Sequence, residues 1–74
     1  MSENKKTYVL KLVKDGKPVG YDAGVLSISS TLESANHYYD RSAALYGASK
    51  ITGYQVEILC VHVAYLVLSS EKLK

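Results

Sequence analysis

Side chains that carry out catalysis in many enzymes gather in the middle of the chain. His37 and Asp40 are spaced i, i+3, and Ser30 and Ser42 flank them. Because a serine hydrolase needs a nucleophile, a base and a carboxylate that orients the base, a triad can be drawn from these residues. The chain lacks the Gly-x-Ser-x-Gly turn that exposes such a serine, and Asp40 already has a sufficient role as a helix cap. We therefore expect no enzymatic activity.

Cys60 and His62 form a second candidate group, because residues two apart on a strand face the same side. Together with His37 they would offer zinc one thiolate and two imidazoles. Cys60 is the only cysteine, which excludes an internal disulfide, and an isolated cysteine is typically a core residue. The five glycines are scattered and form no phosphate-binding loop. We expect neither a metal ion nor a cofactor.

The aromatic residues are all tyrosines: the chain has seven, with no Phe and no Trp. Tyrosine joins an apolar ring to a polar tip and is enriched where protein surfaces meet. One interpretation is a surface for a protein partner, formed by Tyr21, Tyr38, Tyr39 and Tyr46. The alternative is that tyrosine takes the place of Phe in the core, with its hydroxyl at the rim.

Positive charge is concentrated at the N-terminal end, although the net charge of the whole chain is only +2. This end carries five lysines, Lys5, Lys6, Lys11, Lys14 and Lys17, against two acidic residues. Lysines interleaved with tyrosines can follow a nucleic-acid backbone and stack bases. Nucleic-acid binding is therefore the alternative function, although the mild charge does not favour it.

The elements that would position these residues begin with a hairpin. Residues 7–14 alternate, with Tyr8, Leu10 and Leu12 on one face, and predict a central strand. Asp15-Gly16 predicts a tight turn, because both central positions of a type I′ turn need positive φ. Residues 19–23 predict the returning strand, which Gly24 interrupts before a further extended stretch over residues 25–29.

The next part of the chain, residues 30–40, contains two sequence signals for the N-terminal cap of a helix. Ser30-Thr31-Leu32-Glu33 fits a capping box and predicts a short helix over residues 31–36. Asp40 predicts the start of the main helix, residues 41–51, whose apolar residues follow helical spacing. A single helix over residues 31–51 is the alternative.

Residues 54–68 give the strongest strand signal in the chain. Val56 and Ile58 alternate with Gln55 and Glu57, but past Leu59 both faces become apolar. A strand of this length would extend roughly 50 Å, so either it bends into two or a second copy buries its far half. We expect self-association through one face, formed by Leu59, Val61, Val63, Tyr65 and Val67.

The stretch from Leu32 to Ala44, which follows a Tyr-x-x-x-x-x-x-Asp-Gly hairpin, resembles small uncharacterised proteins encoded by phages and prophages of Gram-positive bacteria. In these proteins the hairpin precedes Leu-x-x-Ala-x-x-Tyr-Asp-x-x-x-x-Ala and a final strand. Here Ala35, Tyr39, Asp40 and Ala44 stand at comparable positions, with one extra residue before the Tyr-Asp pair. The resemblance covers about residues 7–60 and implies no known activity, so no binding residue carries over.

These patterns predict one α+β domain: a three-stranded antiparallel sheet with one main helix on one face, in the order ββαβ, and a short helical turn before that helix. The domain spans residues 7–68, between a disordered tail (1–6) and a polar tail (69–74). The longest apolar run is too short to span a membrane, and no export signal is apparent. We expect a cytoplasmic accessory protein that binds another protein, as a homodimer, and has no membrane partner.

Overall fold

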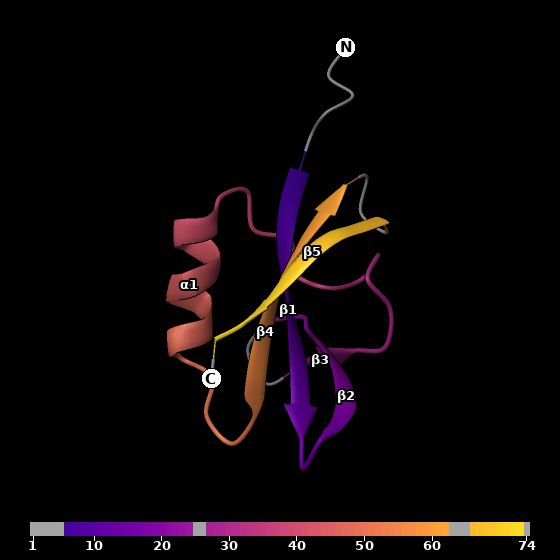
Figure 1. The fold of residues 1–74 in the computed structure, drawn as a ribbon, viewed down its shortest axis with the longest axis vertical. Coiled ribbons are helices and arrows are strands. Elements are labelled where there is room, and N and C mark those ends of the chain that lie inside the picture. The colour runs from indigo at the N-terminus through magenta and orange to yellow at the C-terminus, as the bar shows by residue number, and fades with distance from the viewer. Residues whose placement is uncertain (1–5, 25–26, 63–65, 74) are drawn as a thin grey trace.

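The computed structural model describes residues 6–24, 27–62 and 66–73, which form an antiparallel sheet and one helix (Figure 1). The strands are β1 (Lys6–Lys14), β2 (Lys17–Asp22), β3 (Ile28–Ser29), β4 (Gln55–His62) and β5 (Leu66–Lys72), and the helix is α1 (Arg41–Ser49). Their order in the sheet is β3-β2-β1-β4-β5. The prediction of a single small α+β domain is confirmed, but the predicted three-stranded sheet is wrong, because the sheet has five strands.

The additional strands come from segments that fold back on their neighbours. The apolar segment 54–68 divides into β4 and the start of β5, which pair antiparallel from Glu57↔Lys72 to His62↔Leu66. Residues 69–72, expected in a polar tail, form the second half of β5. Folding back gives this long segment a second ladder of backbone hydrogen bonds, which a single overlong strand would lack. At the other edge, Ile28 and Ser29 pair with β2 as β3.

The β1–β2 hairpin forms as the sequence predicts. Asp15 and Gly16 have φ angles of 53° and 77°, the positive values that a type I′ turn needs. The register then shifts, because Val13 pairs with Pro18 whereas Leu12 pairs with Gly20. This shift is a β-bulge, an irregularity where the missing N–H of a proline is tolerated.

The main helix begins where Asp40 predicts and ends at Ser49. The Asp40 carboxylate accepts a hydrogen bond from the backbone N–H of Ala43 at 2.8 Å, which is N-cap geometry. The predicted short helix over residues 31–36 is wrong, because these residues form bends and a turn. Local hydroxyl bonds explain the difference: the Ser29 hydroxyl accepts from the Thr31 N–H, and the Thr31 hydroxyl from the Ser34 N–H. Such bonds compete with helical ones.

Replacing Asp40 with Ala should lower the free energy of unfolding by about 0.5–2 kcal/mol, because the first turn of α1 loses the acceptor for one backbone N–H. The midpoint of urea unfolding measures the change. Asp40→Ser is the matched control, because serine keeps a capping oxygen and should retain most of the stability. An unchanged midpoint for Asp40→Ala would contradict the capping role.

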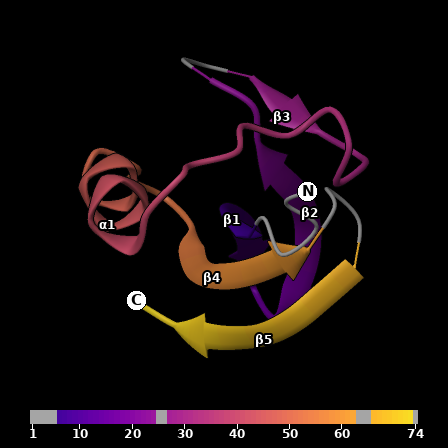
Figure 2. The same cartoon turned by 90° about the horizontal axis from the view of Figure 1, so that it is seen from above.

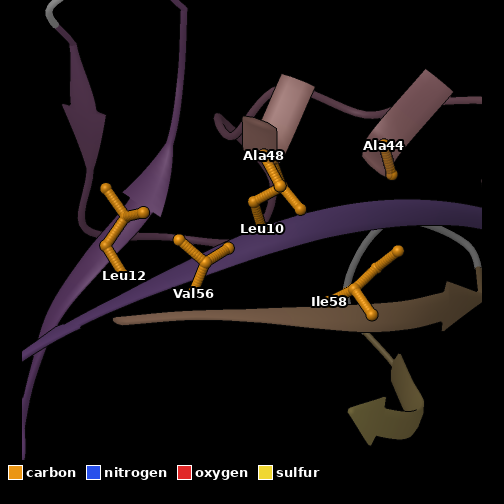
Figure 3. Close-up of a cluster of buried hydrophobic side chains, with 6 residues drawn as sticks. All are labelled: Leu10, Leu12, Ala44, Ala48, Val56 and Ile58. Atoms are coloured by element: carbon orange, nitrogen blue, oxygen red, sulfur yellow. The ribbon is translucent and has the colours of Figure 1, made fainter. Parts of the chain in front are cut away.

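The main core lies between α1 and the β1–β4 pair. Its buried side chains are Leu10, Leu12, Val56 and Ile58 from the strands and Ala44 and Ala48 from the helix. Figure 3 shows the four strand residues projecting from their ribbons toward the two alanines. Because alanine is small, the helix can approach the sheet closely. In Figure 2 the helix stands beside the sheet, and β5 lies outside β4.

The opposite face of the sheet carries a second core. Val9, Leu59 and Val61 are buried there against Ala35, and Leu32 packs against them. Leu59 and Val61, two residues of the predicted self-association face, are 5% and 0% exposed within one chain. The segment before α1 covers them because it forms turns across the sheet instead of a helix.

Candidate functional site

A groove separates the second half of α1 from the β2–β3 hairpin. It encloses about 710 Å³ and is floored by Leu12 of β1. The helix contributes Tyr46 and Gly47, followed by Lys50 and Ile51; the hairpin contributes Asp22 and Ile28; Tyr38 and Tyr54 complete the wall. A volume of this size is within the range of about 300–1,000 Å³ that small-molecule sites occupy. The groove is therefore the candidate binding site of the chain.

The polar centre of the groove is a hydrogen bond between Tyr38 and Asp22. The Tyr38 hydroxyl donates to Oδ2 of Asp22 at 2.9 Å, and the Gly24 N–H donates to Oδ1 at 3.3 Å. Burial raises the pKa of the Tyr38 hydroxyl, and the bond to the Asp22 carboxylate raises this pKa further. Tyr38 is consequently a neutral hydrogen-bond donor at physiological pH.

Backbone contacts hold this pair in place. Tyr38 and Tyr8 exchange two backbone hydrogen bonds of 2.8 Å, and the Asn36 N–H donates to the Asp22 carbonyl at 2.8 Å. A Cβ at Gly47 would lie 2.5 Å from the Tyr38 hydroxyl oxygen. Because Gly47 has no side chain, the Tyr38 ring can lie directly against the helix. This contact explains why a glycine, which is a poor helix former, stands in the middle of α1.

Two of the tyrosine rings at the groove already face cations. The Lys50 ammonium lies 4.4 Å from the centre of the Tyr46 ring. The Lys14 ammonium lies 5.6 Å from the centre of the Tyr54 ring. Both distances are within the reach of a cation–π interaction, so these rings present their negative faces to positive charge.

The structure brings together only part of the tyrosine surface predicted from the sequence. Tyr38 and Tyr46 both line the groove. Tyr21 packs against the second core, and Tyr39 is 78% exposed in the segment before α1. Sequence reasoning missed Asp22, although an aspartate within a strand was a usable signal, because strands are depleted in Asp.

The candidate triad and zinc ligands are not brought together. His37 is bonded at both ring nitrogens: Nδ1 lies 2.6 Å from the Thr7 hydroxyl and Nε2 lies 2.9 Å from the Leu32 carbonyl oxygen. Cys60 and His62, by strand alternation, lie on the α1 face of the sheet, opposite Thr7. Among the described residues, no three His, Cys, Asp or Glu side chains are grouped to hold a metal ion.

The predicted self-association face is divided by the fold. Leu59 and Val61 are buried, Val63 and Tyr65 lie outside the described residues, and Val67 is 43% exposed on β5. Its neighbours Leu66 and Leu68 are 51% and 48% exposed. We call Leu66, Val67 and Leu68 the β5 triplet. The triplet lies on an edge strand, so apolar side chains and an open strand edge coincide there.

The predicted lysine surface is dispersed. Lys6 and Lys14 occupy opposite ends of β1, about 26 Å apart at the rise of an extended strand, and Lys17 begins β2. Lys11 is half-buried and, by strand alternation, faces the other side of the sheet. It stands opposite Glu57 of β4. Lys5 lies outside the described residues. These positions form no continuous basic stripe in the part of the chain that the structure describes.

No helix of the described residues is long and apolar enough to cross a bilayer. The cytoplasmic location stays a prediction, as does the resemblance to phage and prophage proteins carried by Ala35, Tyr39, Asp40 and Ala44. Comparisons of the chain with protein-family models, with curated proteins and with solved structures find no match.

Proposed function

We propose that this chain is a non-enzymatic protein that acts by protein–protein binding and assembles as a homodimer through β5. The β5 triplet is the observation that supports this proposal. Its three side chains follow one another on an outermost strand and are each about half exposed. An open edge offers unpaired backbone groups, and contiguous apolar side chains add a gain from burial. Both features favour pairing with another strand.

The rest of β5 restricts how a second copy would pair. Val67 pairs with Val61 but Ser69 pairs with Cys60, so Leu68 is an extra residue in the ladder. Glu71 and Lys72 place two charges at the other end of the strand. Charged residues discourage indiscriminate edge pairing, so the end with the β5 triplet, which carries no charge, is favoured although it also carries the bulge. A two-fold axis at this end would bring both triplets together and continue the sheet between copies.

Replacing Val67 with Lys should convert the homodimer into a monomer, because the new charge would be buried without a partner at the contact. Sedimentation equilibrium at micromolar concentration measures the mass. Val19→Lys is the matched control: Val19 and Val67 are both 43% exposed strand valines, but Val19 lies on β2. The control should remain dimeric.

A wild-type monomer throughout the concentration range would contradict the homodimer, and loss of the dimer in both variants would contradict the role of β5. Ionic strength supplies a further check. An apolar contact should persist in high salt, because salt screens charges and does not weaken burial. Binding through phosphate contacts, the alternative based on the dispersed lysines, would weaken steeply instead.

A further inference from the structure

No ion pair to the carboxylate in the groove is found among the described residues, and Lys50, which also lines the groove, lies over the Tyr46 ring. Asp22 is the only buried charged residue in the described part of the chain, with 9% of its surface exposed. The donors found for it, the Tyr38 hydroxyl and the Gly24 N–H, are both neutral. The ion pair found among the described residues joins Arg41 to Glu71, on another part of the surface. A carboxylate removed from water is costly without a countercharge, so this site favours a cation.

The aromatic residues around Asp22 also favour a positively charged ligand. Tyr38, Tyr46 and Tyr54 line the groove; the Lys50 ammonium lies 4.4 Å from the centre of the Tyr46 ring, so a ligand cation would have to use the Tyr38 and Tyr54 rings. Aromatic faces attract ammonium ions, particularly where water is excluded. Leu12, Ile28 and Ile51 line the remainder with aliphatic surface. A ligand that matches both parts carries a positive charge and an apolar chain.

We propose that the groove binds a small organic ammonium ion. Its charged group lies against the Asp22 carboxylate and the rings of Tyr38 and Tyr54, and its hydrocarbon part lies against Leu12, Ile28 and Ile51. The Tyr38 hydroxyl holds the carboxylate in position from one side, which leaves the carboxylate's remaining acceptor capacity for the ligand. This binding does not depend on self-association, because the β5 triplet is not part of the groove.

Hexylammonium, 1-hexanol and hexanoate distinguish the charge from the hydrocarbon chain, because the three probes share a chain length. Each is titrated into nitrogen-15-labelled protein and followed by amide chemical shifts. Hexylammonium should give saturable shifts centred on Asp22, Gly24 and Gly47, with an affinity at least about tenfold higher than that of hexanol, since its hydrogen bond to Asp22 is charge-assisted. Hexanoate should bind more weakly than either.

Asp22→Asn tests the role of the charge, because asparagine keeps the shape and an oxygen that can accept from Tyr38. The variant should bind hexylammonium no more tightly than hexanol. Asp15→Asn is the matched control: Asp15 is exposed at a positive φ that asparagine tolerates, so its preference for hexylammonium should be unchanged. If Asp22→Asn fails to fold, the ratio of hexylammonium to hexanol affinity in the wild-type protein decides. Equal affinities, shifts spread over exposed carboxylates such as Glu33, or no saturable shifts would overturn the proposal.

Discussion

Replacing Leu10 with Ala should lower the free energy of unfolding by about 2–5 kcal/mol, as large-to-small changes do in a packed core. The Leu10 side chain has no exposed surface and packs with Val56, Ala44 and Ala48 between the sheet and the helix (Figure 3). Domains have a stability of roughly 0.05–0.15 kcal/mol per residue, so in a chain of 74 residues this loss is a large part of the total. Urea unfolding followed by circular dichroism measures it.

Val19→Ala is the control for Leu10→Ala, because Val19 is an aliphatic residue of the same sheet that remains 43% exposed. Its truncation should change the free energy of unfolding by no more than about 0.5 kcal/mol, as surface substitutions usually do. Similar losses in the two variants would show that Leu10 does not lie in the main core.

Replacing Gly20 with Ala should be comparably destabilising, for a different reason. Gly20 has a φ of 151°, and a Cβ there would lie 2.6 Å from both the Ser29 carbonyl oxygen and the Ile28 Cγ2. The carbonyl is backbone, so it can move only if the β2–β3 pairing is disturbed. Strained backbone costs about 1–3 kcal/mol and overpacking about 1–3 kcal/mol more. Urea unfolding gives the total loss.

Gly16→Ala separates these two contributions. Gly16 also has a positive φ, 77°, but no atom lies within 4 Å of a Cβ built there. This control should show only the cost of backbone strain, whereas Gly20→Ala should also speed amide hydrogen exchange at Ala23, whose N–H donates to the Ser27 carbonyl beside β3. Equal losses in both variants, with unchanged exchange at Ala23, would contradict the close contact between Gly20 and β3.

The sequence alone determined the features that depend on neighbouring residues. Asp15 and Gly16 specify the turn because few residues accept positive φ, and Asp40 specifies the start of α1 because its carboxylate reaches a backbone N–H three residues away. Strand alternation likewise assigned Leu10 and Val56 to the buried side of their strands. Each of these signals is complete within about four residues, so it can be recognised without knowledge of distant contacts.

Local signals failed where two satisfactory local structures compete. Ser30 to Glu33 fits a capping box, but the hydroxyls of Ser29 and Thr31 instead accept from the Thr31 and Ser34 N–H groups in a turn. The structure contains the turn, and with this turn Ala35 packs on the second face of the sheet. Burial of that face, which depends on residues far away in the chain, favours the turn over the helix.

Only the tertiary structure decided the number of strands and the composition of the groove. Periodicity in residues 54–68 shows that both faces are apolar, but it does not say whether the chain folds back or meets a second copy; that depends on what covers Leu59 and Val61. The hydrogen bond between Asp22 and Tyr38 joins residues 16 positions apart. It forms because β2 and the segment before α1 both pair with β1. No local sequence pattern encodes this arrangement.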